Sequence, residues 1–304
     1  MTKSKHYETV IIEKVPFTVE KSNTHYKFDQ TLTLVGAGPA ITVNPGTENI
    51  IIDLTGHELV LPPNFNMGPV LGISITGTEH QVTRNIKIVN GTIRGTGAQN
   101  ERNSNGIALF DTVKCLYVKK VNFIDTLRGV TAGLNSPFRG QFDTYDHITF
   151  VKCTFSHPGP NANFRGLNFP ALQNLLVYKC QFVNNPNGIG IQITNNAKKI
   201  KILSSRFEGQ SRSIGVQSLY TALPNRFFVF QSHDVLISDC EFDGGMDNIV
   251  LFGIKDAKVL RCRSKQGANG FRQLAFSTPF NTAGDIGGPV ARGLLVEDCH
   301  FESQ

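Results

Sequence analysis

Apolar residues alternate with polar or small residues in short pieces along most of this chain. Ile41/Val43, Ile73/Ile75 and Ile107/Leu109 each lie two positions apart, in pieces bounded by Gly or Asn. A period of two in pieces of this length indicates β-strands rather than amphipathic helices. Because no segment with helical spacing separates these pieces, the pattern predicts an all-β chain.

The strand pieces recur in a fixed order. A polar or small residue precedes an apolar–any–apolar triplet, and a second apolar strand follows that ends near Cys-x-Phe, as in Val151-Lys-Cys-Thr-Phe. Self-similarity of this kind is typical of stacked architectures whose units cannot bury their apolar faces alone. We therefore expect a single-stranded right-handed parallel β-helix of about nine coils. The residues aligned in front of the triplets are Pro39, Leu71, Asn105, Arg128, Arg165, Asn187, Arg212, Asp247 and Asn269.

Two further columns are expected inside the helix. One contains Phe residues, among them Phe155, Phe182 and Phe207, and the other contains five of the six cysteines. Inward cysteines at this spacing are expected to be small core-filling side chains rather than disulfides. No Cys-x-x-Cys pair of the zinc-binding type occurs in the sequence.

The repeat has no linker, so a single domain is expected, with an N-terminal capping segment at 1–35 and the β-helix at 36–304. Exposed strand edges invite further pairing and are usually covered. We expect the C-terminal edge to be covered by the 277–292 loop, by a short polar tail or by a second copy of the chain in a homo-oligomer.

Thirty basic and 24 acidic residues give a formal net charge of +6 and a pI of about 9.0. This balance fits an anionic glycan, a nucleic acid or an acidic surface as partner. The basic residues are scattered and are not interleaved with aromatic residues, so no specific nucleic-acid binding is expected. No segment approaches the length of a membrane span, and no signal peptide is visible. The compartment is left open, with an extracellular or virion-associated location as one option.

Two segments resemble a known family. Asn49-Ile-Ile-Ile-Asp-Leu-Thr-Gly-His and Asn85-Ile-Lys-Ile-Val-Asn-Gly-Thr-Ile resemble successive coils of right-handed parallel β-helix proteins of the pectate-lyase-like superfamily, with its carbohydrate-binding and sugar-hydrolase repeats. The resemblance covers about 35–301. It implies the fold, and it implies activities that range from polysaccharide lyases, hydrolases and epimerases to tailspikes and non-enzymatic surface or virion proteins.

The catalytic signatures of these relatives are not met. The Asp-Asp, Gly-His-Gly and Arg-x-Lys motifs of polygalacturonase-like enzymes are replaced by Asn187-Gly-Ile, Arg212-Ser-Ile and Asp247-Asn-Ile. The Tyr-Gly-x-Asp-Pro-His run of alginate epimerases is absent. The standard hydrolase and epimerase mechanisms are therefore not expected.

A candidate substrate surface lies along the triplet strands. Arg128, Arg165 and Arg212 share one column and would form a basic track for an anionic polysaccharide if they point outward. Other outward residues are small, for example Thr131, Gly190 and Gly215, and long insertions at 132–146, 218–233 and 274–293 would form a wall beside this face. Asn168, Gln192 and Gln217 are further candidate substrate-binding residues.

The alignment places Glu208 beside Asp243 on adjacent coils, about 5 Å apart. A carboxylate pair at this spacing suits a retaining glycosidase. It equally suits a Ca²⁺ site of the lyase type, in which Arg212 would neutralise or deprotonate a uronate. Arg212 and Asp247 are likewise expected one coil apart. Ordinary exposed turns with a surface ion pair are the alternative for these catalytic candidates.

Two functions remain open from the sequence. The first is a β-helix that engages an anionic polysaccharide along the triplet-strand face, with lyase or glycoside hydrolase chemistry as one option. No cofactor is expected for it, with Ca²⁺ as the one alternative. The second is a non-enzymatic structural or adhesive rod, such as a virion, spike or surface component.

Overall fold

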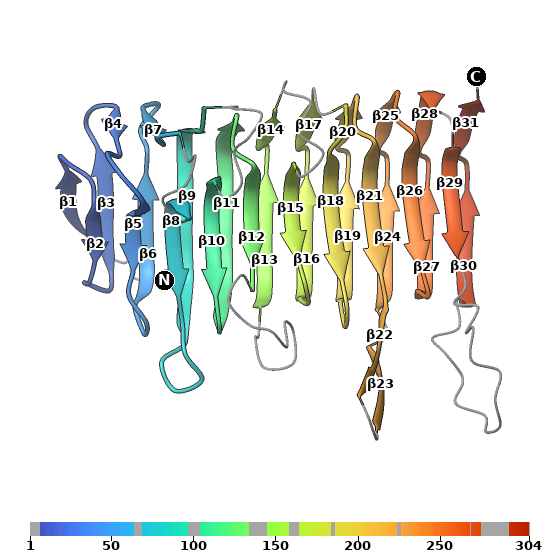
Figure 1. Cartoon of the computed structure of the whole chain (residues 1–304), viewed down its shortest axis with the longest axis horizontal. Coiled ribbons are helices and arrows are strands. Elements are labelled where there is room, and N and C mark those ends of the chain that lie inside the picture. Colours follow the sequence, from blue (N-terminus) through green and yellow to red (C-terminus); the bar gives the residue numbers. More distant parts are fainter. Residues whose placement is uncertain are drawn as a thin grey trace, which may run out of the picture.

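The computed structural model confirms the parallel β-helix and contains no helix among the residues it describes, which are 7–63, 69–96, 104–133, 145–157, 164–183, 186–223, 226–230, 232–267, 269–274 and 292–303. The chain winds as successive coils along one axis, from β1–β4 at one end to β29–β31 at the other (Figure 1). All pairings between coils are parallel within these ranges. No helix long and apolar enough to cross a membrane occurs in the same ranges.

A ten-stranded sheet contains the triplet strands. Its strands are β2 (Phe17–Val19), β5 (Gly38–Val43), β8 (Val70–Thr76), β10 (Ser104–Phe110), β12 (Arg128–Ala132), β15 (Arg165–Phe169), β18 (Ile189–Thr194), β21 (Arg212–Gln217), β26 (Asp247–Phe252) and β29 (Asn269–Leu274). The sequence alignment contains nine of these positions. The additional strand, β2, pairs in parallel with β5.

The remaining strands of the coils form a nineteen-stranded sheet. These strands are β1 (Glu8–Ile12), β3 (Thr24–Phe28), β4 (Leu32–Thr33), β6 (Glu48–Asp53), β7 (Glu58–Val60), β9 (Thr83–Arg94), β11 (Val113–Ile124), β13 (Tyr145–Val151), β14 (Thr154–Ser156), β16 (Gln173–Tyr178), β17 (Gln181–Val183), β19 (Lys198–Leu203), β20 (Arg206–Glu208), β24 (His233–Ser238), β25 (Glu241–Asp243), β27 (Lys255–Leu260), β28 (Arg263–Gly267), β30 (Arg292–Glu297) and β31 (His300–Ser303). β22 (Leu219–Leu223) and β23 (Arg226–Phe230) form an antiparallel hairpin that projects from the rod (Figure 1).

The segment 1–35, expected as a cap, contains strands that continue the helix. β2, β3 and β4 pair in register with β5, β6 and β7, while β1 packs beyond them on β3. These residues therefore wind as a coil of their own, and a capping role for the segment stays a prediction. The 277–292 loop, expected at the other end, lies outside the described residues, apart from Arg292.

The interior is lined by side chains that repeat from coil to coil. Five phenylalanines stack with ring centroids 4.7–5.1 Å apart, from Phe123 on β11 to Phe242 on β25. The expected cysteine column is also confirmed, because Cys153, Cys180, Cys240 and Cys262 are buried and all six cysteines are free thiols. Because similar side chains stack from coil to coil, each coil covers the apolar face of the next one.

A glycine of the triplet strand lies under four of the five rings of this stack, those of Phe123, Phe155, Phe182 and Phe207, whereas Ser213 occupies this position in the coil of Phe242. A Cβ atom on Gly166 would come within 2.7 Å of the Phe182 ring, and one on Gly190 within 3.0 Å of the Phe207 ring. Real Cβ atoms very rarely approach other atoms so closely. The interior of the coil therefore has room for the ring or for the additional carbon, but not for both. This contact explains why a glycine precedes the isoleucine in the Gly-Ile dipeptides of the repeat.

The same contact corrects the alignment of one coil. Asn187 was expected level with Arg165 and Arg212, but Ile189 occupies that position. Two Gly-Ile dipeptides follow one another here, and the second, with Gly190, is the one placed under Phe207. Gln192, rather than Gly190, is therefore the outward residue level with Asn168 and Gly215.

Candidate functional site

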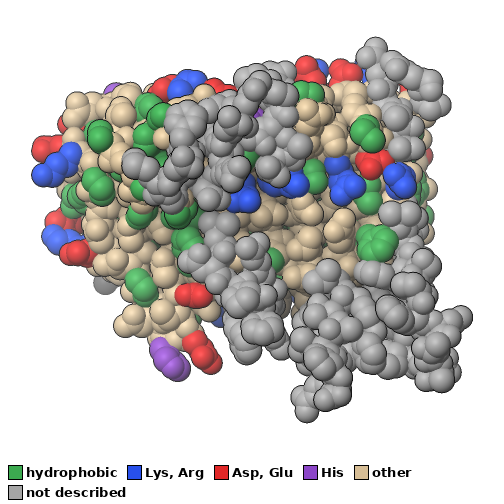
Figure 2. Space-filling model, viewed as in Figure 1, with side chains coloured by type: hydrophobic (Ala, Val, Ile, Leu, Met, Phe, Trp, Pro, Cys, Tyr) green, Lys and Arg blue, Asp and Glu red, His purple; other side chains and the backbone are tan. Residues whose placement is uncertain are grey.

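The outer face of the ten-stranded sheet presents four arginines, Arg128, Arg165, Arg212 and Arg272, and we refer to it as the arginine face. Arg128 and Arg165 are level on adjacent coils, and Ile189 separates Arg165 from Arg212. The predicted basic track is thus present but has an apolar gap of one coil. Figure 2 shows a row of basic side chains, with acidic side chains among them, across the middle of this view.

Arg165 is the most constrained member of the group. Its Nη1 donates to the carbonyl oxygen of Phe164 at 2.7 Å, and its Nε donates to Oε1 of Gln192 at 2.9 Å. Burial lowers the pKa of Arg165, and the positive charges of Arg128 and Arg212 lower it further. Arg128 and Arg212 are therefore each close enough to Arg165 to disfavour its positive charge, an effect that an anion at Arg165 would offset.

Asp247 lies between two of the arginines. Its Oδ2 is 3.7 Å from Nη2 of Arg212, and its Oδ1 is 3.2 Å from Nη1 of Arg272. The carboxylate side chain is only 10% exposed, so both ion pairs are poorly screened by solvent. The predicted adjacency of Arg212 and Asp247 is confirmed by the strand register. In this position the carboxylate holds two guanidinium groups in place on the arginine face.

The other predicted substrate-binding residues lie on the same face. Nδ2 of Asn168 donates to Oγ1 of Thr131 at 3.2 Å, and Gln192 is level with Asn168 on the next coil. Gln217 is half-buried and level with Thr194 and Phe252. Asn168 and Gln192 therefore lie side by side next to the arginines, and Gln217 lies two residues further along its own strand.

Glu208 and Asp243 are level on adjacent coils, as predicted. They end the short strands β20 and β25 of the nineteen-stranded sheet, four residues before Arg212 and Asp247. Both side chains are 43% exposed. Nη2 of Arg206 lies 3.1 Å from Oε2 of Glu208 and 4.0 Å from Oδ2 of Asp243, so a guanidinium group neutralises part of their charge.

The sequence interpretation missed Arg206 and Arg272. Arg206 lies two residues before Glu208, on the same side of a strand, and this spacing was a usable signal. Arg272 lies three residues after Asn269, as Gly215 lies three after Arg212. Its contact with Asp247, however, required the register of β26 and β29.

The Ca²⁺ site considered for Glu208 and Asp243 stays a prediction. No group of three or more His, Cys, Asp or Glu side chains is arranged to hold a metal ion in the described part of the chain. Ca²⁺ takes six to eight oxygen ligands. Glu208 and Asp243 supply two carboxylates, and the guanidinium group of Arg206 lies beside both of them. The catalytic roles of Glu208, Asp243, Asp247 and Arg212 stay predictions.

The wall of insertions beside the arginine face is only partly described. The 218–233 insertion contains the β22–β23 hairpin. Most of the 132–146 and 274–293 insertions lies outside the described residues.

Comparison with known proteins gives similar architectures only. No family model matches the sequence, and no curated protein matches it. The A-module of the mannuronan C-5 epimerase AlgE6 of Azotobacter vinelandii is 10% identical over 97% of this chain and 89% of that chain, with a TM-score of 0.36. The catalytic domain of a GH87 α-1,3-glucanase is 10% identical over 92% of this chain and 61% of that chain, with a TM-score of 0.32.

A third similar structure is the surface protein and adhesin PfbA of Streptococcus pneumoniae. It is 9% identical over 96% of this chain and 90% of that chain, with a TM-score of 0.27. All three are right-handed parallel β-helix proteins, as the sequence resemblance implied. At this level of similarity no residue role and no activity follows from the likeness.

Proposed function

We propose that the protein binds an anionic polysaccharide along the arginine face. The observation that carries this proposal is the group formed by Arg128, Arg165 and Arg212, in which mutual repulsion contributes to the lowered pKa of Arg165. A linear polymer lying along the rod axis would cross all three side chains, because they are one and two coils apart. Its carboxylate or sulfate groups would relieve the repulsion through charge-assisted hydrogen bonds.

Site-directed variants test this directly. Arg165→Ala and Arg128→Ala should each weaken binding of a polyuronate by about tenfold, since a hydrogen bond to a charged group contributes roughly 1.5–3 kcal/mol. Lys258→Ala, an exposed cation on the other sheet, is the matched control and should leave affinity unchanged. Titration calorimetry at two salt concentrations measures the effect. Equal binding of a carboxyl-reduced, neutral polymer would contradict the proposal.

Catalysis at Glu208 and Asp243 is a separate proposal that the level placement of the two carboxylates supports. If they act as acid/base and nucleophile, Glu208→Gln and Asp243→Asn should abolish cleavage while binding persists. If the reaction is instead a lyase elimination, Arg212→Ala should abolish it, and its products should carry an unsaturated end. Unchanged turnover in all three variants on a cleaved substrate would remove this site.

The alternative function, a non-enzymatic adhesive or structural rod, is favoured by a specific arrangement. Asp247 is engaged by two arginines, and Glu208 and Asp243 both lie beside Arg206. Tight binding without any product across a panel of acidic polysaccharides supports the rod. Light scattering then tests the predicted homo-oligomer, which a monodisperse monomer would exclude.

A further inference from the structure

Among the described strands of the two large sheets, lysine occurs in the nineteen-stranded sheet alone, whereas arginine occurs in both. The strands of the ten-stranded sheet contain four arginines and no lysine. The nineteen-stranded sheet contains lysines along much of its length, and we call its outer surface the lysine face. Its strand lysines are Lys27, Lys87, Lys114, Lys119, Lys120, Lys198, Lys199, Lys201, Lys255, Lys258 and Lys265.

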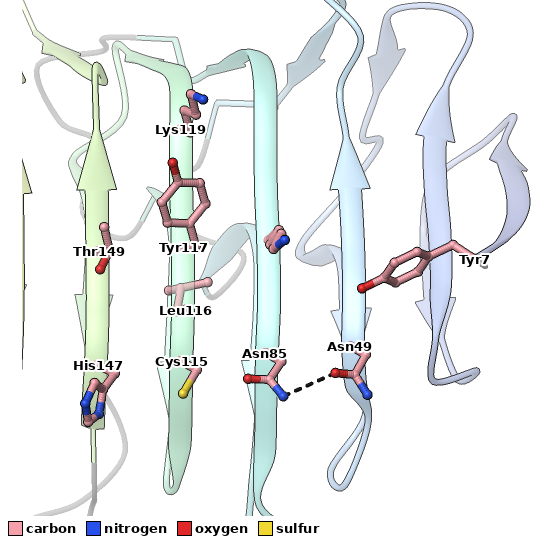
Figure 3. A pocket seen from close by; sticks show the side chains of 10 residues that line it. Tyr7, Asn49, Asn85, Cys115, Leu116, Tyr117, Lys119, His147 and Thr149 are labelled. Carbon is pink, nitrogen blue, oxygen red and sulfur yellow. Dashed lines mark hydrogen bonds between the residues drawn. The ribbon is translucent and has the colours of Figure 1, made fainter. Parts of the chain in front are cut away.

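A pocket of about 750 Å³ lies on the lysine face, across strands β6, β9, β11 and β13. Lys87 and Lys119 line it together with two tyrosines, Tyr7 and Tyr117. Figure 3 shows Tyr7 reaching over the sheet from the N-terminal end and Tyr117 broadside on β11, with β9 between them. Lys87 is level with Tyr117 on the adjacent coil, and it lines the pocket together with both tyrosines.

The polar side chains of the pocket are held by a ladder of amides. Nδ2 of Asn85 donates to Oδ1 of Asn49 at 3.2 Å, and Nδ2 of Asn49 donates to Oδ1 of Asn23 at 3.0 Å. All three residues have a positive φ of 57°, a conformation that Asn tolerates better than most residues. The Oδ1 atom of Asn85 is directed toward the Cys115 side of the pocket (Figure 3).

This set of groups fits one ligand chemistry. Aromatic faces offer platforms for pyranose rings, ammonium groups bind carboxylate or sulfate, and fixed amides bond to hydroxyl groups. Phosphate sites of nucleotides are typically built from backbone N–H groups at helix N-termini, and the described chain has no helix. The neighbouring Lys119 extends the cationic surface one coil beyond Lys87, in the direction of the rod axis.

We propose that the pocket between Tyr7 and Tyr117 is a second binding site, for an acidic oligosaccharide, on the sheet other than the one with the arginine face. A sugar ring packs on Tyr117 and a neighbouring ring on Tyr7, while the acidic substituent bonds to Lys87. The pocket and the arginine face lie on different sheets. This inference stands on its own residues and does not depend on binding at the arginine face.

Cys115 supplies a reporter, because it lines the pocket and is the exposed cysteine, whereas Cys299 is half-buried and the other four are buried. In an Arg128→Ala/Arg165→Ala background, an acidic oligosaccharide should slow modification of Cys115 by a thiol reagent severalfold. One arm uses a carboxylated oligosaccharide and another a sulfated one. Cys115→Ser identifies the fast phase of the reaction.

Variants then locate the contact. Lys87→Ala and Tyr117→Ala should each raise the half-protecting concentration about tenfold, whereas Lys201→Ala should not. Lys201 is the matched control, since it lies in the same outward row four coils away. The proposal is overturned if no acidic oligosaccharide protects Cys115, or if Lys201→Ala raises the half-protecting concentration as much as Lys87→Ala does. Equal protection by a nucleotide such as AMP, or by the neutral, carboxyl-reduced oligosaccharide, would also overturn it.

Discussion

Five coils in the described part of the rod have a glycine beneath a phenylalanine, but two successive coils near the C-terminal end do not. In the first of them, Ser213 occupies the glycine position and Phe242 keeps the ring. In the coil that contains β26 and β28, Asn248 occupies the glycine position and Ser264 the phenylalanine position. Both side chains are buried, and Nδ2 of Asn248 donates to Oγ of Ser264 at 2.5 Å. The stack of five rings ends at Phe242, next to this pair.

The difference shows that a larger polar residue at the glycine position goes with a small residue at the ring position, whereas serine still leaves room for the Phe242 ring. A ring needs the space above a small residue, and Asn248 needs a small polar partner across the same space. The polar pair has a disadvantage, because Oδ1 of Asn248 is buried without a hydrogen-bond partner. Such an atom costs about 1–3 kcal/mol relative to a satisfied one. The repeat therefore accepts a side chain as large as asparagine at the glycine position where the ring across the coil is replaced by a small polar residue.

The largest expected effect is that of filling a glycine position. Gly166→Ala would place Cβ 2.6 Å from the carbonyl oxygen of Gly190 and 2.7 Å from the Phe182 ring. Overpacking of this kind costs about 3 kcal/mol, which should lower the Tm by several degrees. Gly215→Ala is the control, because its Cβ would meet only the flexible side chain of Arg212. Equal melting of the two variants in scanning calorimetry would contradict the close contact.

The next effect concerns the polar pair itself. Asn248→Ala removes the donor to Ser264 and leaves a small cavity, so we expect a loss of about 2 kcal/mol in the free energy of unfolding. Ser264→Ala should cost a similar amount, because it leaves the amide unpaired. The double variant should cost less than the sum of the two single variants. Additive losses in urea denaturation would show that the hydrogen bond contributes nothing.

A sharper test converts the exceptional coil into an ordinary one. Asn248→Gly combined with Ser264→Phe extends the ring stack from Phe242 toward Phe301 and removes the unpaired Oδ1. We expect this pair to be neutral or to stabilise by about 1 kcal/mol, whereas Ser264→Phe alone destabilises. A double variant as unstable as the single Phe substitution would mean that something other than the glycine space limits the ring.

The smallest expected effect on stability concerns a second buried side chain whose polar atoms lack hydrogen-bond partners. His157 is buried against the Phe164 ring, neither ring nitrogen has a hydrogen-bond partner, and Oδ1 of Asp125 is 4.0 Å from Nδ1. Burial lowers the pKa of His157, and the charge of Asp125 opposes this only in part. His157→Phe keeps the stacked ring without the unpaired nitrogens and should stabilise by about 1 kcal/mol at neutral pH.

The same variant should also change the pH dependence. Since the folded pKa of His157 lies below the unfolded value of about 6.5, the unfolded state binds the proton first as the pH falls. Wild-type stability should therefore decrease below about pH 6.5 until the folded pKa is passed. Melting curves of His157→Phe should show a smaller decrease. His80→Phe, at an exposed position, is the control and should keep the wild-type profile.

Much of this architecture was already determined by the sequence. Alternating triplets predicted the strands, and the phenylalanine and cysteine columns predicted the interior, because stacking brings like residues of adjacent coils together. The pairs Glu208 with Asp243 and Arg212 with Asp247 were predicted in the same way. These features depend only on local periodicity and on one step to the next coil.

Only the tertiary structure decided the rest. It placed Ile189 instead of Asn187 between Arg165 and Arg212, because the glycine that fits under Phe207 sets the register across the coil. It brought Arg272 to Asp247 and Tyr7 to the pocket on the lysine face. Such contacts form between segments separated by insertions of variable length, and spacing along the chain does not fix where those segments meet.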